Sequence, residues 1–301
     1  MKTIGLKIDV DTLKGAKVGV PNLARLLNKL GCGATFFLSL GPDNTGRALR
    51  RAWRPSFILK CLKTKVASNY SFSTLLNGVL WPGPHIGGHC ESLLRPLAYQ
   101  ENIELGIHSY DHQRWQNGVN NGMSAAAVQQ EFARASAEFK RIFDKDAKFA
   151  AAPGWQANAK TLAAYAAANI KYASDARGHA PFYPIASGKP FNILQLPTTM
   201  PTLDELLGFD GFSADFDLIK HLTKIAQQQE FSVFTLHAEL EGMKYLEWFS
   251  DLLSYWKALG WNMVTLGSLA KTYEASAPNA NLVQGAFRHR SEKLALQENS
   301  V

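Results

Sequence analysis

The chain has 301 residues, a length that can bury one large core or two smaller ones. Hydrophobic residues make up 46% and charged residues 19%, which argues against intrinsic disorder. The formal net charge is +7. Seven lysines and arginines lie between Asp43 and Glu91, with no acidic residue among them, so positive and negative charges balance in the remainder of the chain. The three cysteines, Cys32, Cys61 and Cys90, lack CxxC spacing, which argues against a disulfide framework and a cysteine-bound zinc.

Membrane-spanning and secretory segments are not expected. The sequence contains no run of 18 or more apolar residues. The first eight residues are too few for a secretory signal ahead of the carboxylates that follow. If those carboxylates, Asp9 and Asp11, are catalytic, the amino terminus must be retained, and we expect the protein to stay in the cytosol.

The first elements predict a parallel sheet. Residues Thr3–Val10 alternate as a strand should and bring Asp9 and Asp11 to its carboxyl end. Two carboxylates two residues apart point the same way from an extended chain, although aspartate is also typical of a strand-ending turn. A short helix over residues 21–30 and a buried-looking strand over residues 34–40 follow. This order predicts a right-handed βαβ unit.

Residues 42–100 interrupt the alternation with a segment that is both basic and apolar. That composition suits an interfacial membrane anchor, and each basic residue near an anionic leaflet contributes about 1 kcal/mol. An ordinary lid folded on the barrel is the alternative, and nucleic acid is disfavoured because the segment has no reader motif. We expect membrane or lipid-phosphate contacts from Arg50, Arg51, Lys60 and Lys63.

Two pairs of histidines have a spacing of four residues. His108 and His112 follow a strand-like segment that stops at Gly106. If the chain turns into helix after His108, the two rings lie one turn apart and suit a divalent metal that takes imidazole nitrogen at about 2.0–2.1 Å. Surface or capping histidines show the same spacing. His85 and His89 enclose two glycines, which disfavour a helix, and have no neighbouring strand-end carboxylate, so we expect no metal there.

The rest of the chain continues to alternate. Residues 124–143 form a predicted amphipathic helix, and further helices are predicted at 158–168 and at about 215–229 and 243–259. Short strands are predicted at 170–174, 193–196, 231–236 and 262–265. This pattern favours one parallel α/β barrel over residues 1–275, which includes the insertion 42–100, and a flexible tail over residues 276–301.

The strand ends of such a barrel carry the reactive residues. Two histidines and one carboxylate leave metal positions open, and a metal polarises a carbonyl and lowers the pKa of bound water. Asp9 is the spare carboxylate that takes a proton, and His237 is the acid for a leaving nitrogen. Asp175 is placed to orient or tune that imidazole. Each of these residues also has a structural explanation, but together they form a complete amide hydrolase.

Three segments, Asp9-Val10-Asp11, residues 104–112 and Leu236-His237, resemble the motifs of the polysaccharide deacetylase superfamily. The resemblance implies an α/β fold, a distorted (β/α) barrel that carries the basic, apolar insertion. It also implies removal of acyl groups from amino sugars with one divalent metal. It assigns Asp9 as general base, His237 as general acid and, as metal ligands, Asp11, His108 and His112.

Longer motifs at residues 151–156, 172–178, 196–205 and 235–239 resemble one branch of that superfamily. Members of this branch remove formate from 4-deoxy-4-formamido-L-arabinose linked to undecaprenyl phosphate, in the aminoarabinose modification of lipid A that confers polymyxin resistance. The resemblance implies a peripheral protein on the cytoplasmic face of the inner membrane. N-deacetylation of another amino sugar or glycan is the alternative, and a non-catalytic glycolipid-binding protein is a third hypothesis.

One position departs from the superfamily pattern. Many members carry an arginine that braces the base where this chain has Ala151, and Arg177 is our candidate for its replacement. The resemblance also implies that the main-chain amide of Trp155 or Gly154 holds the oxyanion. The sequence leaves the identity of the metal open, because zinc, manganese, cobalt and nickel all accept the predicted ligands.

Overall fold

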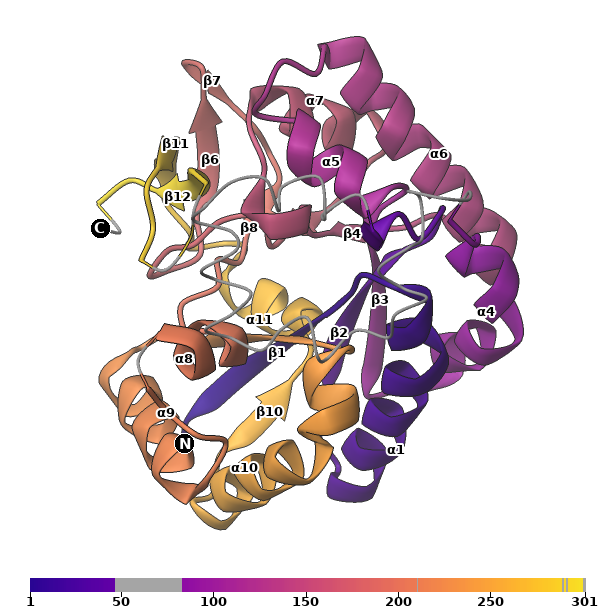
Figure 1. Ribbon diagram of the computed structural model, residues 1–301. Coiled ribbons are helices and arrows are strands. Elements are labelled where there is room, and N and C mark those ends of the chain that lie inside the picture. Colours follow the sequence, from indigo (N-terminus) through magenta and orange to yellow (C-terminus); the bar gives the residue numbers. More distant parts are fainter. Residues whose placement is uncertain (47–82, 210, 289, 291, 300–301) are drawn as a thin grey trace.

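The computed structural model describes residues 1–46, 83–209, 211–288, 290 and 292–299 (Figure 1). Much of the predicted basic insertion lies outside the described residues. None of the helices in the described part of the chain combines the length and the apolar character that crossing a lipid bilayer requires. The four predicted membrane or lipid-phosphate contacts also lie outside the described residues: Arg50, Arg51, Lys60 and Lys63.

An eight-stranded parallel sheet forms the centre of the fold. Neighbouring strands follow the order β10-β1-β2-β3-β4-β5-β8, and β9 also pairs with β1. The strands are β1 (Thr3–Val10), β2 (Ala34–Ser39), β3 (Ile103–Ser109), β4 (Phe149–Ala150), β5 (Tyr172–Ala173), β8 (Leu194–Gln195), β9 (Val233–His237) and β10 (Asn262–Val264). β1 is buried from its second residue to its last, as a central parallel strand covered on both faces should be.

The chain after β8, the last strand of this order, meets β9. The main-chain N–H groups of Thr199 and Met200, just past β8, both donate to the carbonyl oxygen of Val233 in β9 at 3.2 Å. Since β9 pairs with β1 while β8 ends the other side of the order, these bonds require the sheet to curve. The result is the distorted α/β barrel that the sequence predicts.

Helices surround this sheet (Figure 1). They are α1 (Val20–Leu30), α4 (Ile86–Leu94), α5 (His112–Gly118), α6 (Ala125–Phe143), α7 (Ala159–Ala167), α8 (Leu203–Phe209), α9 (Phe216–Gln228), α10 (Leu246–Ala258) and α11 (Leu266–Tyr273). Shorter turns are π-helical in η1 (Gly15–Gly19) and η6 (Leu240–Lys244) and 3₁₀-helical in η4 (Arg95–Tyr99) and η5 (Pro153–Trp155). The apolar stripe predicted for α6 is buried, and Ser124 caps the helix by accepting from the N–H of Ala127.

Helix α4 differs from the expectation for its sequence. The segment after His85 is helical although its first turn contains Gly87 and Gly88. The Nδ1 of His85 accepts from the N–H of Gly88 at 3.1 Å and so caps the helix. A Cβ on Gly87 would lie 2.8 Å from the carbonyl oxygen of Leu40, so glycine lets α4 pack closely against the end of β2. His85 is therefore a structural cap.

The carboxyl-terminal segment also differs, because we expected a flexible tail there. It forms β11 (Asn279–Gly285) and β12 (Leu294–Gln297), which join β6 (Tyr183–Ala186) and β7 (Lys189–Pro190) in a four-stranded sheet. All four residues of β12 are buried. The N–H of Arg177 donates to Ala295, and the carbonyl of Arg177 accepts from Gln297. These long-range bonds order a segment whose own composition is polar.

Candidate active site

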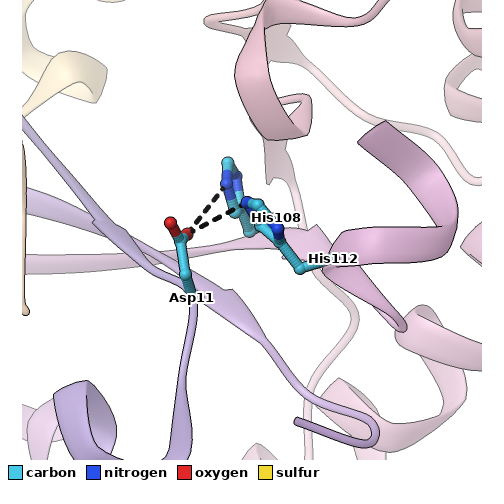
Figure 2. Close-up of side chains that lie close together, drawn as sticks. All are labelled: Asp11, His108 and His112. Carbon is cyan, nitrogen blue, oxygen red and sulfur yellow. Dashed lines mark ion pairs between the residues drawn. The ribbon is translucent and has the colours of Figure 1, made fainter. Parts of the chain in front are cut away.

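The three predicted metal ligands come together where β1 and β3 end (Figure 2). Asp11 follows β1, His108 lies in β3, and His112 is the first residue of α5. The spacing predicts two histidines one turn apart on a single helix. The structure differs, because β3 stays extended past His108 and the helix begins only at His112. Asp111 caps α5 by accepting from the N–H of Arg114 at 3.0 Å, which holds the turn in place.

The distances among these ligands fit one bound ion. Asp11 Oδ1 lies 3.3 Å from His108 Nε2 and 3.4 Å from His112 Nε2 (Figure 2, dashed lines). Atoms that share one tetrahedral ion through bonds of about 2.0–2.1 Å lie roughly 3.3–3.4 Å apart. Among the described residues, this is the one cluster of histidine, cysteine and acidic side chains close enough to share an ion.

The protonation of these groups also suits a metal. His108 Nδ1 donates to the carbonyl of Ala151 at 2.7 Å, so the neutral ring has its lone pair on Nε2, facing Asp11 Oδ1. That oxygen is buried without a hydrogen-bond partner in the described part of the chain. Burial lowers the pKa of His112, which favours the neutral ligand form. Burial alone would raise the pKa of Asp11, but His112 and His108 hold it far below its ordinary value.

Asp9 and His237 lie beside this cluster as register partners in β1 and β9. Asp9 Oδ1 is 3.9 Å from His108 Nδ1. Burial alone would lower the pKa of His237, but nearby carboxylates, Asp204 first and then Asp11 and Asp9, raise it above its ordinary value. A raised pKa favours the protonated form of the ring, which a general acid needs. Sequence reasoning missed Asp204, which is the second residue of α8.

Asp175 contacts the loop after β4 rather than His237, which corrects the prediction for this residue. Its Oδ1 accepts from the N–H of Ala152 at 2.7 Å and from the hydroxyl of Tyr165 at 3.2 Å, and its Oδ2 accepts from Gln195 Nε2 at 3.0 Å. Burial raises the pKa of Asp175 to about 6. Asp175 follows β5, which pairs with β4 and β8 and not with β9.

The sequence and the fold of this chain match those of known proteins. The family model described as "Polysaccharide deacetylase" matches residues 2–173, more than half of the chain. The chain belongs to the polysaccharide deacetylase family. A relative from Shewanella sediminis (strain HAW-EB3) is 34% identical over 250 residues, which cover 83% of this chain and 80% of the relative. One from Wigglesworthia glossinidia brevipalpis is 33% identical over 243 residues, which cover 80% of this chain and 83% of the relative.

Both relatives bear the name "Probable 4-deoxy-4-formamido-L-arabinose-phosphoundecaprenol deformylase ArnD". Among solved structures, a Mycobacterium smegmatis protein assigned as a polysaccharide deacetylase superimposes with a TM-score of 0.64 at 14% identity, over 95% of this chain and 94% of that one. At this identity the likeness shows the fold alone. As a member of the polysaccharide deacetylase family with deformylase relatives, the protein is a hydrolase of carbon–nitrogen bonds in non-peptide amides.

The cation beside Asp9 differs from the one we expected in this polysaccharide deacetylase. Arg177, the candidate to replace the family arginine missing at Ala151, pairs instead with Glu205, its Nη2 lying 3.5 Å from Oε2. Lys7 is the cation beside Asp9, with 3.2 Å between Nζ and Oδ2. The signal was present in the sequence, because residues two apart on a strand share a face.

Gly154 and Trp155 form the turn η5 at the end of β4, both with left-handed φ values, 58° and 55°. The main-chain N–H of Trp155 donates to Ala152 at 3.1 Å, and its indole N–H donates to the hydroxyl of Thr198 at 3.1 Å. A Cβ on Gly154 would lie 2.7 Å from Gln116 Nε2, and the positive φ also favours glycine at this position. The oxyanion role of either amide stays a prediction.

Glu239 is a further residue to which sequence reasoning gave no role. Its Oε1 accepts from the N–H of Asp11 at 3.0 Å, and from the N–H and hydroxyl of Thr12 at 2.8 and 2.9 Å. Burial raises the pKa of Glu239 to about 7. The side chain thus ties the loop after β9, which follows His237, to the loop after β1, which carries a metal-ligand candidate.

Proposed function

We propose that this protein removes formate from 4-deoxy-4-formamido-L-arabinose linked to undecaprenyl phosphate, with one divalent metal. The observation that carries the proposal is the Asp11–His108–His112 cluster, whose oxygen-to-nitrogen distances of 3.3 and 3.4 Å match ligands of a single ion. The substrate is supported by two relatives that bear the name of this deformylase and match most of both chains.

The metal would be held by Asp11 Oδ1 and by the Nε2 atoms of His108 and His112, with further positions open. A bound divalent cation would polarise the formyl carbonyl and favour attack by water. Zinc, manganese, cobalt and nickel all accept this set of ligands.

The chain's own residues supply the proton transfers of the proposed reaction. A water oxygen attacks the formyl carbon, and the bond between that carbon and the sugar nitrogen breaks to give formate and a free amine. Asp9 accepts the proton of the attacking water through Oδ1, which has no hydrogen-bond partner among the described residues. His237 donates a proton to the departing nitrogen, and its raised pKa supports that role.

The proposed substrate joins an anionic phosphate to a long apolar chain, so the enzyme would act peripherally at the cytoplasmic face of the inner membrane. The basic and apolar composition of residues 42–100 supports contact with such a surface. Its product would serve aminoarabinose modification of lipid A and, through it, polymyxin resistance. N-deacetylation of another amino sugar is the second candidate, because the match to the deacetylase family also fits it.

Mass spectrometry of a synthetic formamido-arabinosyl phosphoprenol tests the proposal. After incubation with metal-loaded protein, we expect the substrate mass to fall by one carbonyl unit and formate to appear. Protein treated with a chelator should leave the substrate intact, and adding metal back should restore turnover. The N-acetyl analogue, run in parallel, separates the two candidates: turnover of that analogue alone would overturn the deformylase proposal.

A further inference from the structure

Lys7 is a cation in the middle of the barrel. Its side chain is fully buried, and its strand is held on both sides, with Lys7 opposite Thr35 of β2 and Thr235 of β9. Burying an ammonium group is costly unless a negative charge lies beside it. An uncharged residue would fill this position at lower cost, so a lysine here requires a reason.

The partner of that ammonium is Asp9. Lys7 Nζ lies 3.2 Å from Asp9 Oδ2, and it makes no hydrogen bond that meets normal geometry within the described part of the chain. The rings of Phe37 and Trp155 flank it, with 5.9 and 5.4 Å from Nζ to the ring centroids. Aromatic faces attract a cation and exclude water, which strengthens the attraction between Lys7 and Asp9.

Other charged groups nearby are already engaged. Both carboxylate oxygens of Asp175 accept hydrogen bonds, from Ala152, Tyr165 and Gln195. Arg177 pairs with Glu205 instead. Ala151, at the end of β4, is buried and offers no charge. Among these groups, Lys7 alone can hold the Asp9 carboxylate.

We propose that Lys7 is the positioning residue for Asp9: its ammonium holds Oδ2, which leaves Oδ1 directed to the metal-ligand cluster. Oδ1 is the oxygen that lies 3.9 Å from His108 Nδ1 and has no hydrogen-bond partner among the described residues. One oxygen of the carboxylate is thus anchored and the other stays available for a proton. The inference rests on the proposed function for the role of Asp9 as base.

Three variants test this role. Lys7→Met removes the charge at similar length, and Lys7→Arg keeps it. Lys2→Met is the control just before the same strand, where Nζ contacts the carbonyl of Gln229. A positioned general base contributes about 10²–10⁴-fold to rate. We expect the kcat of Lys7→Met to be at least about 100-fold lower than that of wild type, with unchanged KM and metal content. The kcat of Lys7→Arg should be at least about tenfold higher than that of Lys7→Met.

Either of two kinetic results would overturn the inference: a Lys7→Met enzyme with wild-type kcat, or a Lys7→Arg enzyme no faster than Lys7→Met. If Lys7→Met does not fold, Lys7→Gln takes its place in the same comparison. Crystal structures of the variants give a reading without substrate, in which the Asp9 carboxylate should rotate in Lys7→Met and stay in place in Lys7→Arg. A wild type that leaves the formamido sugar intact would refute the proposed function, whereas an unmoved Asp9 in Lys7→Met would refute the role of Lys7.

Discussion

Replacing His108 with alanine removes one of three proposed ligand atoms. A four-ligand structural zinc site binds with about 10–16 kcal/mol, so an equal share for one ligand is roughly 3–4 kcal/mol. At about 1.4 kcal/mol per tenfold, the variant should bind its metal roughly two to three orders of magnitude more weakly than wild type. Competition between the metal-free protein and a chromophoric chelator measures this affinity directly.

The same change should also destabilise the metal-free protein. The carbonyl of Ala151 loses its donor, His108 Nδ1 at 2.7 Å, and an unsatisfied buried acceptor costs about 1–3 kcal/mol. Calorimetry should therefore show a lower Tm without metal. His89→Ala is the matched control, because His89 is exposed on α4 and its ring, among the described residues, bonds the carbonyl of His85 at the start of its own helix. Unchanged metal affinity in His108→Ala, or an equal loss in His89→Ala, would refute the assignment.

Asp9→Ala is expected to abolish turnover and keep the metal content at the wild-type level, because Asp9 lies outside the ligand cluster; equal loss of metal would make it a ligand. Asp204→Asn should lower the pKa of His237, so the fall of kcat/KM at alkaline pH, where the acid loses its proton, should begin at lower pH. An unshifted profile would exclude Asp204 from this role. Neutralising four basic residues together should release the protein from anionic vesicles in cosedimentation and spare turnover of a short-chain analogue, whereas unchanged binding would favour a lid. These four are Arg50, Arg51, Lys60 and Lys63.

Strand ends were the reliable signal in the sequence. Alternation in β1 and β3 indicates where each strand stops, and in a parallel barrel the residues at those ends meet at one rim. Asp11 and His108 are brought together in this way although 97 positions separate them. The spacing of His108 and His112 pointed to the correct pair for a different reason, because a turn and a helix start, rather than one helical face, bring the rings together.

Contacts between elements were not predictable from local pattern. Asp175 does follow a strand, but only the strand order shows that β5 lies between β4 and β8 and does not pair with the strand of His237. Asp204 belongs to a helix start, where an acidic residue is ordinary, and nothing local indicates that its charge acts on the His237 imidazole. β12 has four residues and depends on the main chain of Arg177 for its order. Each case requires the tertiary arrangement.

Asp9 in β1 and Asp11 just after it have different surroundings because of how one ring is held. The carbonyl of Ala151 fixes the proton of His108 on Nδ1, and that side of the ring faces Asp9 Oδ1 at 3.9 Å. The lone pair on Nε2 faces Asp11 Oδ1 at 3.3 Å, where a cation can bridge the two. Lys7 Nζ lies 3.2 Å from Oδ2 of Asp9, so a positive charge lies beside one oxygen of that carboxylate, whereas Oδ1 has no hydrogen-bond partner among the described residues. These different surroundings support our proposal that Asp9 acts as the base and Asp11 as a metal ligand, although both side chains are aspartates.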